Sequence, residues 1–197
     1  LKISFPTLNN LVSELVANKI IINAQKGISV GGRKPNLYEL NSSVFNVLCI
    51  QIERFSIHVS LADNRNEELD PGLEESLHLS KDKSSLARIE ELVASYISRQ
   101  GISWDNISGV IITMPGLIND IKGTNKTFLY EAGFSLKDYF ELQYKKKVYI
   151  INDVKLAAFA ELRHGAAEGK NNAIIILMDW GIGIGLIING KVYMGAD

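Results

Sequence analysis

Apolar side chains recur every three or four positions in three parts of the chain, and this is the spacing of one face of an amphipathic helix. The first part follows Ser4 and Pro6, a hydroxyl side chain and a proline that are typical of a helix start. The second ends at Gly101, and glycine commonly follows the last helical residue. The pattern therefore predicts a helix that starts at residues 4–7 and carries its apolar face on residues 8–16, and helices over residues 84–100 and 134–144.

Short apolar runs bounded by turn residues predict β-strands. Asn189-Gly190 lies between two of these runs and is the strongest short signal for a hairpin turn. Successive strands come first and strands alternating with helices follow, an order that favours a mixed sheet with right-handed crossovers. The predicted strands are residues 20–22, 37–40, 44–52, 56–62, 76–79, 107–113, 148–151, 173–178, 186–188 and 191–194, with a glycine-rich turn at 179–185.

One stretch combines a strand, a polar pair and a helix. The apolar residues 148–151 are followed at once by Asn152 and Asp153, and an alanine-rich helix then runs to Gly165. A polar pair at the end of a buried parallel strand lies where α/β sheets place ligand-binding groups. The alternative is that Asn152 or Asp153 caps the helix by accepting a hydrogen bond from a backbone amide. Taken alone, the pair favours capping.

The N-terminal order of helix, strand, basic tip and strand is that of a winged helix-turn-helix from its recognition helix onward. In this interpretation the helix contacts bases or phosphates, and the glycine-rich tip at residues 23–34 contacts phosphates. The alternative is a helix and hairpin with a solvated loop, and the pattern alone does not separate the two. The candidate DNA-binding residues are Thr7, Asn9, Asn10, Ser13, Lys26, Arg33 and Lys34.

Composition and charge narrow the functional classes. The 197 residues are 46% hydrophobic, carry a formal net charge of −1 and include one cysteine, which indicates a globular chain without an internal disulfide. No apolar run approaches the roughly 18 residues of a membrane helix, and the first 30 residues do not have the pattern of a signal peptide. Together with the single cysteine, this leads us to expect a cytoplasmic protein with no membrane contact. Residues 1–41 carry five Lys/Arg against two Glu, a basic excess that hints at nucleic acid. The histidines are isolated and lack ligand spacing, so no metal site is predicted.

Four segments together resemble the ROK family of repressors, open reading frames and kinases, in particular the transcriptional-regulator branch of NagC- and XylR-type sugar-responsive repressors. They are SFPTLNNLVSELVANKIII with its GGRKPNLYELN wing, GVIITMPG, YIINDVKLAAFAELRHGA and GIGIGLIINGKVYMGA, and they span nearly the whole chain in the family's order. The resemblance implies the α/β actin-like ATPase (ribonuclease H-like) fold. Residues 1–41 would be a partial winged helix-turn-helix, 42–165 the first lobe, and 166–197 the opening of a truncated second lobe. We accordingly expect the chain to be a fragment.

The resemblance also assigns roles to the polar pair and to two loops. Kinases of the family use the aspartate at the position of Asp153 as a base, because an alcohol must lose its proton as it attacks phosphorus. A binding protein can use the same carboxylate without chemistry, so the resemblance favours ligand contact over capping for Asp153. The predicted ligand-binding residues are Asn152, Asp153, Pro115 and Gly116, and the remnant of a phosphate loop is Gly181, Gly183 and Gly185.

Two departures from the kinase pattern argue against phosphoryl transfer. Where family kinases carry an Asp-x-Gly-x-Thr turn for the nucleotide phosphates, this chain has Gln51, Glu53 and Phe55. A glutamate at that point adds like charge and fills the space that phosphate oxygens need. Trp180 takes the place of the threonine before the second phosphate loop. The family's zinc ligands would lie beyond residue 197, so no cofactor is predicted for these residues.

The sequence thus predicts a sugar-responsive transcriptional regulator, a repressor that binds operator DNA through the winged helix and a sugar or sugar phosphate in the cleft. A homodimer or higher homo-oligomer is expected from half-site geometry and from the family. Two alternatives stay open. One is an ATP-dependent hexose kinase with Asp153 as its base, and the other is a pseudokinase whose N-terminal module docks a protein.

Overall fold

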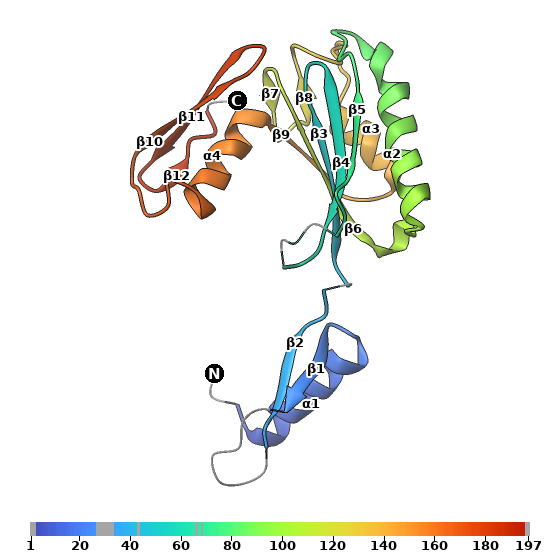
Figure 1. Ribbon diagram of the computed structural model, residues 1–197, viewed down its shortest axis with the longest axis vertical. Coiled ribbons are helices and arrows are strands. Elements are labelled where there is room, and N and C mark those ends of the chain that lie inside the picture. Colours follow the sequence, from blue (N-terminus) through green and yellow to red (C-terminus); the bar gives the residue numbers. More distant parts are fainter. Residues whose placement is uncertain (1–2, 27–33, 43, 66, 68, 196–197) are drawn as a thin grey trace.

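The computed structural model describes residues 3–26, 34–42, 44–65, 67 and 69–195, which form three parts (Figure 1). A helix and a hairpin at the N-terminus lie apart from the rest. A five-stranded sheet with two α-helices forms the central part, and a three-stranded sheet with one helix forms the C-terminal part. Within these ranges no helix combines the length and apolar character needed to cross a membrane.

The N-terminal module begins with its helix where the sequence predicts it. The Ser4 hydroxyl accepts a hydrogen bond from the Thr7 backbone amide at 3.3 Å, and Pro6 occupies the first turn, where no amide is needed. The apolar stripe of this helix is not covered, since none of its residues is buried in the structure. The elements are α1 (Phe5–Ala17), β1 (Ile21–Lys26) and β2 (Asn36–Leu40), with β1 and β2 antiparallel.

The central sheet has the strand order β5-β4-β3-β6-β9. β3 is antiparallel to β4 and parallel to β6, and β6 is parallel to β9, so the predicted mixed sheet is confirmed. Two helices cross over between strands and lie on one face of the sheet (Figure 1). The strands are β3 (Asn46–Ile52), β4 (Ser56–Ala62), β5 (Leu73–Ser76), β6 (Ile107–Met114) and β9 (Val148–Asn152), and the helices are α2 (Leu86–Gln100) and α3 (Leu136–Tyr144). Short elements complete this part: the 3₁₀ turns η1 (Lys83–Ser85) and η2 (Trp104–Asn106), and the small hairpin β7 (Ile118–Asn119) and β8 (Thr124–Asn125).

The core lies between this sheet and the two helices. Alternate residues of β3 are buried, as expected for a strand with one covered face. α2 buries its stripe at the predicted spacing and ends at Gly101 in the left-handed conformation, with φ 63°. Burial of each large aliphatic side chain contributes about 1.5–3 kcal/mol, so this stripe holds α2 on the sheet. The buried residues of α2 are Leu86, Ile89, Leu92, Val93, Tyr96 and Ile97.

The C-terminal part is an antiparallel sheet with α4 packed on it. Asn189 and Gly190 both have positive φ, 52° and 71°, which is the primed turn that an Asn-Gly hairpin requires. The predicted hairpin is therefore confirmed. The elements are α4 (Asp153–His164), β10 (Ala173–Met178), β11 (Ile182–Ile188) and β12 (Lys191–Val192).

Two predicted segments are wrong in position. The strand expected at 76–79 lies at Leu73–Ser76, because the backbone amides of Leu77 and Leu79 leave the ladder and donate to the carbonyls of the β3–β4 turn. The glycine-rich segment 179–185 is not one turn. β11 pairs with β10 from Ile182 onward, so only residues 179–181 connect the two strands.

Candidate functional site

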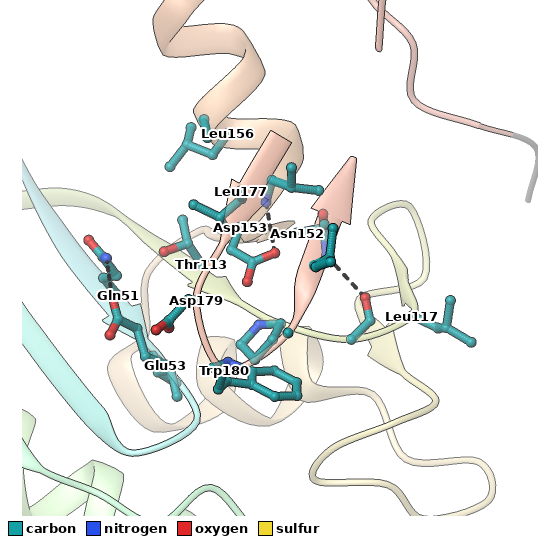
Figure 2. Close-up of a pocket in the computed structure, with 18 of the residues that line it drawn as sticks. Gln51, Glu53, Thr113, Leu117, Asn152, Asp153, Leu156, Leu177, Asp179 and Trp180 are labelled. Atoms are coloured by element: carbon teal, nitrogen blue, oxygen red, sulfur yellow. Dashed lines mark hydrogen bonds between the residues drawn. The ribbon is translucent and has the colours of Figure 1, made fainter. Parts of the chain in front are cut away.

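A cavity of about 830 Å³ lies between the central sheet and the C-terminal part (Figure 2). β3, β6 and β9 run parallel, so their carboxyl ends meet at one edge of the sheet, and residues from all three ends line the cavity. The connection between β10 and β11 forms the opposite wall. The sheet topology thus brings together residues that are more than a hundred positions apart in the sequence.

The end of β3 contributes Glu53, whose carboxylate is held in place by two neighbours. It accepts a hydrogen bond from the Gln51 side-chain amide at 2.8 Å and another from the Ser56 hydroxyl at 2.9 Å. Figure 2 shows the Glu53 carboxylate facing the same space as the carboxylates of Asp153 and Asp179. Glu53 is therefore a fixed part of the cavity wall. From the sequence it was noted only as a departure from the phosphate turn of the kinases.

The end of β6 contributes the Pro115-Gly116 turn, which the buried Asn125 side chain supports. The Asn125 Nδ2 donates a hydrogen bond to the Pro115 carbonyl at 2.9 Å, and its Oδ1 accepts hydrogen bonds from the backbone amides of Thr127 and Phe128. Gly116 has φ +110°, and a Cβ there would lie 2.7 Å from the Asn125 Oδ1, so only glycine fits. Asn125 was missed in the sequence because nothing local distinguishes it from a surface asparagine.

At the end of β9, Asn152 caps α4 and Asp153 lines the cavity. The Asn152 Oδ1 accepts the Lys155 amide at 3.3 Å as the cap of α4, while its Nδ2 donates to the Gly116 carbonyl at 3.1 Å. Its side chain thus joins α4 to the neighbouring turn. Asp153 is the first helical residue and turns its carboxylate toward the cavity (Figure 2). Ligand contact by either residue stays a prediction.

The electrostatics of the cavity are acidic. Burial is the main cause that raises the pKa of the Asp153 carboxyl above its ordinary value, and the negative charges of Glu53 and Asp179 raise it further. The Val154 backbone amide opposes this by donating to the Asp153 Oδ1 at 2.7 Å. Among the described residues that line the cavity there is no lysine, arginine or histidine to balance these charges.

This raised pKa predicts a pH-dependent gain in stability for Asp153→Asn. Between 3.8 and the raised native pKa the folded protein holds more protons than the unfolded chain, so its stability falls as pH rises through that window. At pH 7 the ionised Asp153 therefore opposes folding, and the asparagine variant should melt at a higher temperature. The gain should vanish below about pH 3.8, where the carboxyl is protonated in both states. Thermal melts across pH 3–7 measure this, and a destabilised variant at pH 7 would contradict it.

One wall of the cavity is aromatic. Trp180, in the β10–β11 connection, is half exposed and meets the ring of Phe128 edge to face, with centroids 6.1 Å apart at 82°. The guanidinium of Arg54 lies over the ring of Phe128, 5.2 Å from its centroid. The contact between Trp180 and Phe128 joins the C-terminal part to the central part beside the cavity. The sequence did not predict that Trp180, Asp179 and Thr113 would meet there, because they lie on different elements.

The predicted remnant of a phosphate loop has a packing role in this structure. A Cβ on Gly185 would lie 2.8 Å from the Ala158 Cβ, and one on Gly183 would lie 3.1 Å from the Val154 Cβ. Both glycines therefore let β11 approach α4 closely. A Cβ on Gly181 would meet nothing within 4 Å. Gly181 and Gly183 line the cavity, whereas Gly185 does not.

The candidate DNA-binding residues lie on the N-terminal module, which is separate from the central and C-terminal parts (Figure 1), and none of them lines the cavity. The four on α1 are exposed, and the Thr7 hydroxyl is 2.8 Å from that of Ser4. Lys26 and Lys34 are exposed at the end of the β1–β2 hairpin. Arg33 lies outside the described residues. In the described part of the chain no three His, Cys, Asp or Glu side chains are grouped as metal ligands would be.

The sequence and the structure are similar to those of known proteins. A family model described as "ROK family" matches residues 47–197. The xylose repressor of Bacillus spizizenii is 26% identical over 196 residues, which are 97% of this chain and 50% of the repressor. The chain spans about half the length of the curated relatives that it matches over nearly its whole length.

Solved structures show the same fold. A ROK family transcriptional regulator, described as a homolog of the E. coli MLC protein, matches with a TM-score of 0.73 and 20% identity over 98% of this chain and 50% of its own. A ROK family glucokinase from Streptomyces griseus, in complex with glucose and AMPPNP, matches with a TM-score of 0.62 and 24% identity over 77% of this chain and 47% of its own. The central and C-terminal parts therefore have the α/β architecture of the actin-like lobes in these proteins.

Proposed function

Because this chain belongs to the ROK family, we propose that it acts as a sugar-responsive transcriptional repressor. One observation carries the proposal. The similarity to the xylose repressor covers 97% of the chain, so it includes the N-terminal helix and hairpin as well as the α/β part. The family match itself begins at residue 47, after that module, and is shared by regulators and kinases alike.

In this proposal the N-terminal module, residues 1–41, is a partial winged helix-turn-helix that binds operator DNA. The polar face of α1 enters the major groove, and the hairpin contacts phosphates. Support comes from the exposure of the polar residues on α1 and from Lys26 and Lys34 at the end of the hairpin. A homodimer would present two such modules to two half-sites.

The effector is a sugar or sugar phosphate bound in the cavity between the first lobe, residues 42–165, and the start of the second, residues 166–197. The Asp153 carboxylate accepts a sugar hydroxyl, and the Pro115-Gly116 turn brings backbone close to the ligand. A sugar in this position contacts both parts of the molecule, so it can favour one arrangement of the lobes. A coupling of about 1–3 kcal/mol between effector and operator is typical of such systems.

Operator binding is tested by band shifts of the full-length protein on the DNA that flanks its gene. The double variant Lys26→Ala/Lys34→Ala should bind roughly tenfold more weakly, because it loses two phosphate contacts. The slope of log K against log salt should become less steep by about two. The matched control is Lys145→Ala/Lys146→Ala, beyond the end of α3 on the central part. Equal affinity and equal salt slope for the wild type and both double variants would contradict operator binding through the hairpin. A protein–DNA complex that none of the tested sugars changes would contradict the sugar response.

The acidic cavity favours this function over the kinase alternative. The triphosphate of ATP is strongly anionic, and like charges in a partly buried site repel each other by several kcal/mol. Glu53, Asp153 and Asp179 supply such charges from three different segments of the chain. Sugar-dependent ATP hydrolysis by the intact protein, lost in Asp153→Ala, would overturn this choice.

A further inference from the structure

The described wall of the cavity carries negative charge and no positive side chain. Glu53 comes from the end of β3, Asp153 from the start of α4 and Asp179 from the β10–β11 connection. Their carboxylates face one space in Figure 2. A phosphate group in this cavity would add about two negative charges to those of three carboxylates, with no Lys or Arg among the described lining residues to offset them.

The start of α4 does not offer the usual compensation. The first amides of a helix normally make a good anion site. Here the Val154 amide is already bonded to the Asp153 carboxylate at 2.7 Å, and the Lys155 amide to the Asn152 side chain at 3.3 Å. Protein groups thus occupy the donors that a phosphate would use.

Glu53 cannot easily move out of the way. Its two carboxylate oxygens are held separately, one by the Gln51 side chain and the other by the Ser56 hydroxyl. The charge is therefore fixed at the wall of the cavity.

The rest of the wall fits an uncharged sugar. Sugar hydroxyls donate to carboxylates in short, charge-assisted hydrogen bonds. The C–H faces of a sugar ring need an apolar surface, and the half-exposed ring of Trp180 with Leu156 and Leu177 provides one on the cavity wall. Pockets of this kind combine apolar walls with a few placed polar groups.

From this arrangement we propose that the effector is an uncharged sugar, that phosphorylated sugars are rejected, and that Glu53 enforces the distinction. The inference rests on the proposed function and narrows its effector from two ligand classes to one. Glu53 acts by its charge at a fixed position. Neutralising it should therefore raise the affinity for the phosphorylated sugar more than it changes the affinity for the parent sugar.

The test is calorimetric titration of the full-length protein at pH 7 with paired probes. The pairs are glucose with glucose 6-phosphate and N-acetylglucosamine with its 6-phosphate, and xylose is titrated as well. Where a parent sugar binds, its phosphate should bind at least tenfold more weakly. Glu53→Gln should reduce that ratio at least tenfold, while Glu75→Gln, an equal charge change at an exposed residue of β5 that does not line the cavity, should leave it unchanged. If Glu53→Gln does not fold, Asp179→Asn removes another of the three charges and should reduce the ratio in the same direction.

The outcomes separate this inference from the proposed function. A sugar phosphate that binds as tightly as its parent sugar overturns the inference and leaves a sugar-responsive regulator standing. An unchanged ratio in both charge-neutralising variants overturns the role of the acidic wall. If no sugar of either class binds, the proposed sugar response fails and the inference falls with it.

Discussion

Asp153→Ala should weaken sugar binding by about two orders of magnitude or more while leaving the protein folded. A hydrogen bond to a charged group contributes about 1.5–3 kcal/mol, so loss of a carboxylate that accepts one or two hydroxyls should weaken the sugar about a hundredfold or more. Because burial and the neighbouring charges of Glu53 and Asp179 raise the Asp153 pKa, removing this carboxylate relieves an unfavourable native interaction at neutral pH. Calorimetric titration with the sugar that the wild type binds measures the loss.

The control for this variant is Asp105→Ala, an exposed aspartate in η2 that does not line the cavity. It should bind the sugar as the wild type does. Band shifts without sugar should also be unchanged in Asp153→Ala, since the N-terminal module lies apart from the cavity. Sugar binding within a factor of two of the wild type in Asp153→Ala would show that the predicted ligand contact is wrong.

Gly185→Ala should destabilise the protein by roughly 1–3 kcal/mol, the usual range for inserting a methyl group into a packed interface. The new Cβ would lie 2.8 Å from the Ala158 Cβ and 2.9 Å from the Val154 carbonyl oxygen, so α4 and β11 must move apart. For a chain of this size the loss corresponds to a Tm lower by about 2–12 °C. Urea and thermal unfolding of the full-length protein measure it.

Gly181→Ala is the matched control, because its Cβ would meet nothing within 4 Å and its φ is not in the left-handed region. Its effect should stay within about 0.5 kcal/mol, as for most substitutions at open positions. Equal stability of the two variants would mean that Gly185 is not needed for packing.

Most elements could be predicted because their signals are local. The stripe of α2 and its terminal Gly101 lie within one segment, and the turn at Asn189-Gly190 needs only two residues with positive φ. β5 was misplaced because its position depends on pairing with Ser56–Val59 of β4, and residues 73–79 carry no local sign of where that ladder ends. A strand boundary set by a distant partner cannot be derived from periodicity.

The candidate site was predicted only where its residues adjoin a recognisable element. Asn152, Asp153 and the Pro115-Gly116 turn directly follow apolar strands, and the parallel pairing of β6 with β9 brings them together. The sequence did not show which of Asn152 and Asp153 caps α4, because either side chain could have accepted a hydrogen bond from the first backbone amides of α4. Asn125 was missed because its hydrogen bonds join it to a turn ten residues earlier.

By itself the sequence determined the order of helices and strands, the mixed sheet, the polar residues at the carboxyl ends of β6 and β9, and the resemblance to the ROK family. These depend on periodicity, turn chemistry and short motifs, which act between neighbouring residues. Only the tertiary structure decided that Glu53, Asp153 and Asp179 share one cavity, that Trp180 meets Phe128 beside it, and that Gly185 serves packing against α4. The reason is physical: electrostatic repulsion, burial and steric contact depend on distances in space, and those distances exist only once the strands have paired.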